Sequence, residues 1–304
     1  MKLKGRDGIM TPEHKDGDLV FLGIYTSKRC NLKCLYCFED AGKESDNETT
    51  LEEKISMIEQ GIEMGAKVLF IAGAGEPTID SQFRSVVEHS YKRGLTTLVY
   101  TNGTIIDSGL AQFMFGHDVT PVVKIESLHE DIHDELVGRK WGYQRAMQGI
   151  NSLLAAGYGD VRDEFTRIGI AAVYTRLNMH GLLDLKEWCE QISIKLMVDW
   201  MLIRGRAGDS EDLLKPTAAE IIQVGERFGE ESAGDILQGN CIFWRYGITI
   251  DQAGYARPCT GFPTKLIGNI RKSSLEELNR IKNERFPKRC GLYTCFFKDE
   301  AYRK

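Results

Sequence analysis

Hydrophobic positions follow two alternating patterns between residue 18 and about residue 230. Short runs rich in β-branched and aromatic residues alternate with stretches in which apolar side chains recur every three or four positions. Between the first two runs, Leu51, Ile55 and Ile58 lie at i, i+4 and i+7, on one face of an amphipathic helix. This alternation is typical of βα units around a parallel sheet, so we predict an α/β fold with six such units.

The pattern also predicts where the elements lie. Strands are expected over residues 19–26, 67–72, 96–101, 122–126, 167–173 and 195–201. Helices are expected over residues 51–62, 81–92, 143–156, 182–191 and 217–228. In parallel β/α folds the loops that leave the carboxyl ends of the strands build the active site. We therefore expect the chemistry directly after these strands.

Composition and charge narrow the function classes. The chain has 304 residues, 42% of them hydrophobic, enough for one barrel-sized domain and a small appendage. Its net charge is −5, from 39 basic and 44 acidic residues, and no basic run offers a footprint for nucleic acid. The longest apolar runs, such as residues 68–74, are too short to span a membrane, and the first residues lack the apolar segment of a signal peptide. We expect a cytoplasmic protein that binds neither membrane nor nucleic acid.

Three cysteines, Cys30, Cys34 and Cys37, lie in one loop directly after the first predicted strand. Four cysteines normally saturate a [4Fe-4S] cluster, and the next cysteine is Cys189. Three thiolates at i, i+4 and i+7 can hold three irons and leave the fourth open to another ligand. A zinc site would need a further Cys pair or a histidine nearby, and a disulfide would need an oxidising compartment. The loop therefore predicts an iron–sulfur cluster with one open coordination site.

The spacing Cys-x3-Cys-x2-Cys, with the aromatic Tyr36 before the third cysteine, resembles the signature of the radical S-adenosylmethionine (SAM) superfamily. The resemblance implies that the amino and carboxylate groups of SAM chelate the open iron. It also implies a partial (β/α)6 TIM-like barrel. Tyr36 and Phe38, on either side of Cys37, are implied to pack near the adenine of SAM.

Two glycine-containing turns extend the resemblance. Residues 73–77, Gly-Ala-Gly-Glu-Pro, follow the second strand and resemble the family's Gly-Gly-Glu-Pro motif, whose backbone binds the SAM ammonium group; Ala74 stands where the family usually has glycine. The cofactor-binding residues implied here are Gly73, Gly75, Glu76 and Pro77. Residues 101–103, Thr-Asn-Gly, are similar to another turn of the family and imply a role for Asn102, although an ordinary Asn-Gly turn explains them equally well.

Polar residues after the fourth and sixth strands complete the expected SAM site. Glu126 and Ser127 are implied to contact the ribose or carboxylate of SAM. Arg204 and Arg206 lie in a Gly-Arg-Ala run similar to that of family members, and either could pair with the SAM carboxylate in a bidentate contact or with the substrate. Solvated loop arginines are the alternative.

A second group of cysteines lies near the C-terminus. Cys241, Gly254 and Cys259 fit the Cys-x9–15-Gly-x4-Cys pattern that opens the SPASM and Twitch extensions of radical SAM enzymes, around a predicted hairpin. Four cysteines remain from Cys241 onward, so Twitch, with one auxiliary [4Fe-4S] cluster, is the better match; a zinc site is the alternative. The implied ligands of this second cluster are Cys241, Cys259, Cys290 and Cys295.

These features predict four parts of the chain. They are an N-terminal extension (1–17), the radical SAM partial barrel (18–208), a connector with one helix (209–239), and a small β-hairpin and helix domain for the auxiliary cluster (240–304).

The resemblance implies that a reduced cluster cleaves SAM to a 5′-deoxyadenosyl radical, which takes hydrogen from a substrate C–H bond. Similar Twitch enzymes include 2-deoxy-scyllo-inosamine dehydrogenase. We therefore expect oxidation of an alcohol in a small molecule, a sugar or aminocyclitol of natural-product biosynthesis, with the auxiliary cluster as electron acceptor. A reducing electron donor such as flavodoxin or ferredoxin is the implied partner. Glu126, Tyr174 and Arg204 are the candidates for assisting deprotonation.

Three alternatives stay open. A radical epimerase would need a cysteine outside the clusters as hydrogen donor; Cys189 is the candidate, although its helical context indicates a buried structural thiol. Modification of a ribosomal peptide is the second alternative. A non-catalytic iron–sulfur scaffold or sensor is the third, and it would leave the turn at residues 73–77 unexplained.

Overall fold

The computed structural model describes residues 2–5, 13–15, 17–162, 164–217, 219–220, 242–260 and 266–286. In this part of the chain the main feature is a nine-stranded sheet in the order β11-β10-β9-β2-β3-β4-β5-β7-β8. All neighbours from β9 to β8 are parallel, and β10 and β11 are antiparallel additions. Its strands are β2 (Phe21–Ile24), β3 (Val68–Ile71), β4 (Thr96–Thr101), β5 (Val119–Lys124), β7 (Gly169–Tyr174), β8 (Lys195–Trp200), β9 (Gly247–Ile250), β10 (Tyr255–Arg257) and β11 (Gly268–Asn269). A separate parallel pair is formed by β1 (Lys2–Leu3) and β6 (Phe165–Thr166).

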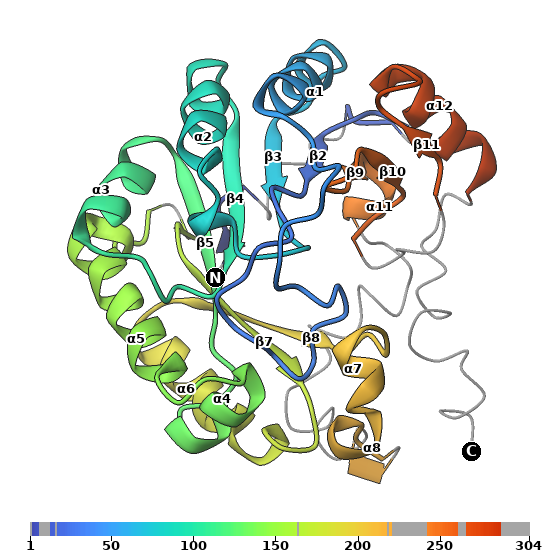
Figure 1. The fold of residues 1–304 in the computed structure, drawn as a ribbon. Helices are drawn as coiled ribbons and strands as arrows, with labels where there is room; N and C mark the ends of the chain where they lie inside the picture. Colours follow the sequence, from blue (N-terminus) through green and yellow to red (C-terminus); the bar gives the residue numbers. More distant parts are fainter. Residues whose placement is uncertain are drawn as a thin grey trace.

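The six strands predicted from the hydrophobic pattern are confirmed as β2, β3, β4, β5, β7 and β8. The largest shift is in β5, which begins at Val119 rather than at residue 122. Figure 1 shows these strands as an arc with helices on its outer side. The predicted α/β fold with a partial barrel is therefore confirmed.

Helices cover the outer face of the arc. The helices of the described residues are α1 (Leu51–Glu63), α2 (Phe83–Lys92), α3 (Ser108–Gly116), α4 (Glu130–Val137), α5 (Gly142–Leu153), a π-helical turn (Leu154–Tyr158), α6 (Leu182–Gln191), α7 (Arg206–Asp209), α8 (Glu211–Leu214), α11 (Ile242–Tyr246) and α12 (Leu275–Arg285), with 3-10 turns at Pro77–Ile79 and Met179–Gly181. Not all of them lie outside: α11 contributes Phe243 to the inward-facing cluster. Four predicted helices are confirmed, and most of the fifth, 217–228, lies outside the described residues. α3 was not predicted; its start is capped by Asp107, which accepts from the Leu110 amide. Among the described residues, no helix has the length and apolar character to cross a membrane.

Side chains alternate between the two faces of each strand and form two cores. The outward residues pack against the helices in one large cluster. Inside the barrel, Phe70 contacts Tyr100 with ring centroids 5.4 Å apart and Phe243 at 4.9 Å, and Phe243 also contacts Phe21 at 4.9 Å. These rings belong to a second cluster of buried side chains, separate from the cluster under the helices.

The C-terminal hairpin continues the sheet of the barrel. β9 pairs in parallel with β2, from Phe21 opposite Gly247 to Ile24 opposite Ile250. The division expected at residue 240 therefore does not separate two sheets. Pairing covers the edge of β2 that would otherwise expose unpaired backbone groups. Gly23 permits this contact, because a Cβ there would lie 2.6 Å from the Thr249 hydroxyl.

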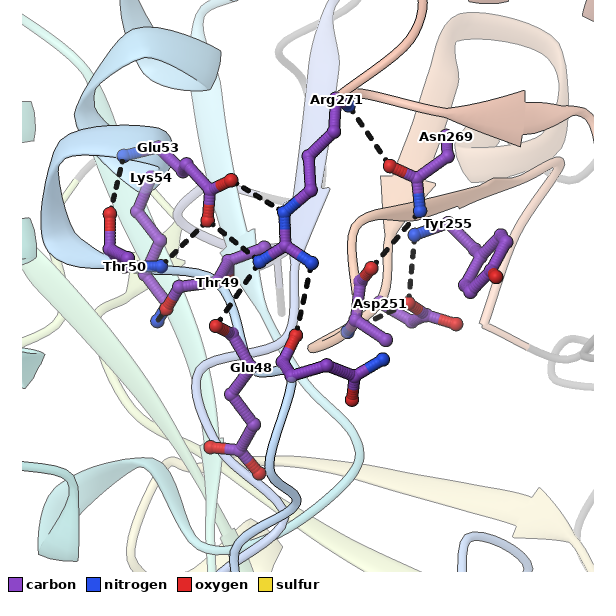
Figure 2. A network of polar contacts seen from close by, with 11 residues as sticks. Glu48, Thr49, Thr50, Glu53, Lys54, Asp251, Tyr255, Asn269 and Arg271 are labelled. Carbon is purple, nitrogen blue, oxygen red and sulfur yellow. Dashed lines mark hydrogen bonds and ion pairs between the residues drawn. The ribbon is translucent and has the colours of Figure 1, made fainter.

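A polar network attaches the hairpin side of the sheet to the start of α1 (Figure 2). Arg271, between β11 and α12, binds both carboxylate oxygens of Glu53, at 2.6 and 2.9 Å. It also donates to the backbone carbonyls of residues 47 and 48, at 3.2 Å each. The hydrogen bond from Arg271 is the main cause that lowers the pKa of Glu53 to about 2. Nearby, the Thr49 amide donates to the Gln252 carbonyl at 2.7 Å, so the hairpin also contacts this segment directly.

We expect the Arg271–Glu53 pair to stabilise the fold measurably. In a double-mutant cycle of Arg271→Gln and Glu53→Gln, the coupling in the free energy of unfolding should be about 1 kcal/mol at pH 7, because the contact is bidentate and partly buried. Since the pKa of Glu53 falls from 4.5 to about 2 on folding, the coupling is complete above about pH 4.5 and is lost as the pH falls through 2. Urea titrations across this range measure it.

The matched control is the Arg280–Glu284 pair, which lies on the exposed face of α12 with its charged atoms 2.7 Å apart. The same substitutions there should give a coupling of about 0.3 kcal/mol. Equal coupling energies for the two pairs would contradict a special role for Arg271.

Candidate active site

The loop that carries Cys30, Cys34 and Cys37 leaves the carboxyl end of β2. In Figure 1 this blue segment runs across the strand ends. Backbone hydrogen bonds close it at its base: the Cys30 amide donates to the Gly42 carbonyl at 3.1 Å, and the Gly42 amide donates to the Lys28 carbonyl at 2.9 Å. The cysteine loop, defined here as residues 28–42, therefore begins and ends at one point above the barrel.

The carboxyl end of α4 supports the middle of the cysteine loop. The Lys33 amide donates to the Val137 carbonyl at 3.0 Å, and the Leu35 amide donates to the Leu136 carbonyl at 2.8 Å. Gly138 ends α4 with φ +67, and a Cβ there would lie 2.6 Å from the Lys33 carbonyl oxygen. Glycine at this position lets the helix end and the loop approach each other.

The three thiols lie in one shared environment. Burial is the main cause that raises the pKa of Cys30 to about 11 and the pKa of Cys34 further, and the neighbouring thiols of the set add to both increases. The Ala41 amide donates to the Cys37 sulfur at 3.4 Å, and none of the three forms a disulfide.

This donor set fits a [4Fe-4S] cluster, since the three thiols come from one loop, lie near one another and become thiolates when they bind iron. In the described part of the chain, no group of three His, Cys, Asp or Glu side chains could hold a single metal ion. A [4Fe-4S] cluster does not need three side chains around one metal ion, because each cysteine binds a different iron.

The turn after β3 packs against the start of the cysteine loop. A Cβ on Gly75 would overlap the carbonyl oxygen of Arg29, and the Glu76 amide donates to that same oxygen at 2.8 Å. Gly73, with φ +93, lies against the ring of Tyr25, which follows β2. Both glycines are therefore required by close approach of neighbouring groups.

The carboxylate of Glu76 ties this turn to the next strand. The side chain is buried and accepts hydrogen bonds from the Thr101 hydroxyl at 2.6 Å and the Asn102 amide at 2.6 Å. It also accepts from the hydroxyl and amide of Thr78, at 2.5 and 3.0 Å. Pro77, also buried, opens the 3-10 turn that presents Thr78. Burial raises the pKa of Glu76, and the hydrogen-bond donors favour its charged form.

Asn31, which no sequence motif had pointed to, joins the cysteine loop to the turn after β4. The side-chain oxygen of Asn31 accepts a hydrogen bond from the side-chain nitrogen of Asn102 at 2.8 Å. The side-chain nitrogen of Asn31 donates to the Thr104 hydroxyl at 2.8 Å. The Thr104 hydroxyl in turn donates to Asn102 at 2.7 Å. The signal in the sequence was an asparagine directly after the first loop cysteine, because this side chain can donate and accept at once.

Arg204 and Arg206, the predicted arginines after β8, both contact the cysteine loop. Arg204 pairs with Glu39 at 2.9 Å and donates to the Phe38 carbonyl at 3.2 Å. Its guanidinium carbon lies 5.9 Å from the centroid of the Phe38 ring. Arg206 pairs with Asp40 at 2.6 Å.

The same segment follows the loop backbone closely. Arg206 donates to the carbonyls of Cys34 and Ala41, at 3.1 and 2.8 Å. Gly205, with φ +55, fits between them, since a Cβ there would lie 2.9 Å from the Cys37 carbonyl oxygen. The alternative of solvated arginines is therefore wrong, and both arginines attach the loop to β8.

Glu126 points into the barrel and is fully buried. One carboxylate oxygen accepts from the Val173 amide at 2.6 Å, and the other lies 3.5 Å from the Lys124 ammonium. Lys124 also lies over the ring of Tyr36, 5.6 Å from its centroid. Burial is the main cause that raises the pKa of Tyr36, with Cys34 and Glu126 as neighbours. The structure thus brings Tyr36 and Glu126 together and adds Lys124, which the alternation along β5 could have identified as inward-facing.

Three sequence candidates lie away from this group. Ser127 accepts from the His129 amide at 3.0 Å and so supports the turn before α4. Tyr174 lies in the helix-facing core, where its hydroxyl donates to the Glu220 carbonyl at 3.0 Å. Cys189 lies in the same core on α6, and burial raises its pKa to about 12. Strand alternation explains why Tyr174 faces the helices, because Val173 before it faces the interior.

Cys259 is the predicted auxiliary-cluster ligand that falls in the described part of the chain. It is buried just after β10, and its charge is among the causes that raise the pKa of Tyr25. β10 runs antiparallel to β9, with Arg257 opposite Thr249, so the chain beyond Arg257 heads towards the amino ends of β9 and β2. The other three predicted ligands, Cys241, Cys290 and Cys295, lie outside the described residues.

Sequence comparisons agree with this arrangement. The model of the radical SAM superfamily matches residues 24–188, more than half of the chain. Fe-coproporphyrin III synthase of Methanosarcina barkeri is 26% identical over 219 residues, which cover 69% of this chain and 52% of that protein. Mycofactocin maturase MftC of Mycolicibacterium smegmatis is 25% identical over 222 residues, 72% of this chain and 54% of the relative. The chain spans about half the length of these curated relatives.

Solved structures share the fold. SuiB of Streptococcus suis bound to S-adenosylmethionine superposes with a TM-score of 0.68 at 19% identity, covering 86% of this chain and 65% of that one. The anSMEcpe protein with bound AdoMet gives a TM-score of 0.67 at 18% identity, covering 88% and 83%. At these identities the likeness shows the fold alone.

We predict that Ala74→Gly stabilises the protein. Ala74 has φ +50, a left-handed conformation that is strained for a residue with a side chain. Glycine there should raise the free energy of unfolding by about 1 kcal/mol, whereas Ala72→Gly, at the preceding buried position, should lower it by about 1 kcal/mol. Urea denaturation measures both, and a loss of stability in Ala74→Gly would contradict the strain.

Proposed function

The chain belongs to the radical SAM superfamily, and we propose that it is an enzyme that uses SAM and a [4Fe-4S] cluster bound by Cys30, Cys34 and Cys37. When bound, these cofactors supply a 5′-deoxyadenosyl radical that takes a hydrogen atom from a substrate C–H bond. The observation that carries the proposal is the braced cysteine loop at the carboxyl ends of the parallel strands, where β/α folds place their active sites.

The chain's own residues have defined tasks in this proposal. Glu76, Asn102 and Asn31 hold the loop against the turns after β3 and β4. Arg204 and Arg206 hold it against the segment after β8. In this proposal the backbone of residues 73–75 binds the SAM ammonium group, and Tyr36 and Phe38 lie near the adenine. These contacts orient the reactants and exclude water from them.

For the substrate we propose a small hydroxylated molecule, a sugar or aminocyclitol, whose alcohol is oxidised. Oxidation requires a group that accepts the hydroxyl proton. Glu126 suits this task, because it faces the interior, is fully buried, and has its second carboxylate oxygen 3.5 Å from the Lys124 ammonium. Tyr174 faces the helices and Arg204 is paired with Glu39, so Glu126 is our choice among the three candidates.

The remaining partners stay as proposals from the sequence. We assign an auxiliary [4Fe-4S] cluster, the electron acceptor, to the four late cysteines Cys241, Cys259, Cys290 and Cys295. A reducing protein such as flavodoxin or ferredoxin is the proposed electron donor. Epimerisation with Cys189 as hydrogen donor loses support, because this thiol is buried between α6 and the outside of the sheet.

Peptide modification is the second candidate function. Mycofactocin maturase and the antilisterial bacteriocin subtilosin biosynthesis protein AlbA of Bacillus subtilis, 22% identical over 82% of this chain, are among the relatives. SuiB has been solved with its precursor peptide SuiA. A peptide substrate would use the same loop, turns and Glu126, so the two candidates differ in the molecule bound rather than in the chemistry.

Iron content and SAM cleavage test the cluster assignment. Anaerobically reconstituted protein should hold about eight irons, and the variant Cys30→Ala/Cys34→Ala/Cys37→Ala about four. With dithionite, the unmutated protein should release 5′-deoxyadenosine and the triple variant none. Cys189→Ala is the control and should match the unmutated protein in both measurements. About four irons in the unmutated protein would remove the auxiliary cluster, and equal release from the triple variant would remove the assignment of the loop.

The mass of the product and a substitution at Glu126 test whether the reaction is an oxidation. The product should be two hydrogens lighter than the substrate, with no deuterium taken up from deuterium oxide. Glu126→Gln should slow product formation about 100-fold or more, because the proton acceptor is lost. Tyr174→Phe should retain the rate within about twofold, since its hydroxyl faces the helix layer. A product of unchanged mass that carries solvent deuterium would contradict oxidation and favour epimerisation.

A further inference from the structure

Tyr25 is a buried tyrosine at the reaction end of the barrel, and its hydroxyl makes no hydrogen bond to the part of the chain that the structure describes. It follows β2, is 1% exposed, and its ring is held against Gly73 of the turn after β3. Among the described residues, its hydroxyl oxygen has no hydrogen-bond partner. A buried hydroxyl without a partner is unfavourable, so native structures usually pair such groups or direct them at a ligand.

Tyr158 provides the internal comparison. It is also fully buried, at the end of the π-helical turn after α5, and its hydroxyl donates to the Val119 carbonyl at 2.9 Å. The described residues therefore provide a hydrogen-bond partner for the hydroxyl of Tyr158 and none for that of Tyr25. In the described part of the chain the other buried hydroxyls without a partner belong to threonines. Thr97 and Thr120 lie at the amino ends of β4 and β5, away from the site, whereas Thr49 precedes α1 and Thr26 is the residue after Tyr25.

The groups around Tyr25 are committed to other contacts. Asp251 accepts from the amides of Ala253 and Tyr255 and pairs with Arg257. Glu39, on the cysteine loop, is paired with Arg204. Both carboxylates are close enough to contribute to the raised pKa of Tyr25, whose main cause is burial. The hydroxyl thus lies between the cysteine loop and the hairpin that carries Cys259.

We propose that the Tyr25 hydroxyl is a binding group for the molecule that occupies the reaction end of the barrel, where it hydrogen-bonds to an oxygen or nitrogen atom of that molecule. This inference rests on the proposed function, in which two such molecules meet here: SAM, with its ribose hydroxyls and aminocarboxylate, and the hydroxylated substrate. Either one supplies a partner of the kind that the described residues do not.

The test compares Tyr25→Phe with Tyr158→Phe in cluster-loaded protein without SAM. Removing an unpaired hydroxyl should leave the urea midpoint of Tyr25→Phe equal to or above that of the unmutated protein. Removing a paired one should lower the midpoint of Tyr158→Phe. A drop in Tyr25→Phe as large as that in Tyr158→Phe would overturn the proposal, because it would show a partner within the chain. The urea midpoints can be compared even if the protein cleaves no SAM. A failure of this proposal can therefore be distinguished from a failure of the proposed function.

Two further measurements identify the ligand. If Tyr25 binds SAM, the dissociation constant for SAM should rise about tenfold in Tyr25→Phe. If it binds the substrate, SAM affinity should be unchanged and the yield of product per 5′-deoxyadenosine should fall about tenfold. Unchanged values in both measurements, with an active unmutated protein, would also overturn the proposal.

Discussion

A buried carboxylate, that of Glu76, joins the parts on which the site depends. It accepts hydrogen bonds from the turn that contains it and from the end of β4, so it joins the carboxyl ends of two neighbouring strands. The cysteine loop then rests on both turns through Arg29 and Asn31. A buried charge is stable only when it is well hydrogen-bonded, and each of these donors is therefore required by the fold itself.

The cysteine loop has little regular structure of its own, which makes its supports decisive. Ordering such a segment is entropically unfavourable, and the loop gains compensating contacts from the end of α4, the turns after β3 and β4, and the segment after β8. These contacts hold the three thiols near one another. A loop that the rest of the chain holds in place lowers the entropic penalty of binding a cluster.

The C-terminal hairpin extends the sheet that carries the cysteine loop. Because β9 pairs in parallel with β2, the cysteine loop and the turn of the hairpin leave the same end of the sheet. Tyr25 and Glu39 lie at this junction, together with the Asp251–Arg257 pair.

By itself the sequence determined the features that depend on local spacing: six parallel strands, the thiols of Cys30, Cys34 and Cys37, and the tight turn at residues 73–77. Hydrophobic period, cysteine spacing and glycine position are all properties of short segments. It could not assign partners across the chain. Arg206 and Cys34 are 172 positions apart, yet their contact decides that Arg206 supports the loop. The tertiary structure likewise placed Tyr174 in the helix-facing core, Lys124 in the barrel interior and β9 beside β2. Such contacts depend on how distant segments pack, and no local pattern of residues specifies that packing.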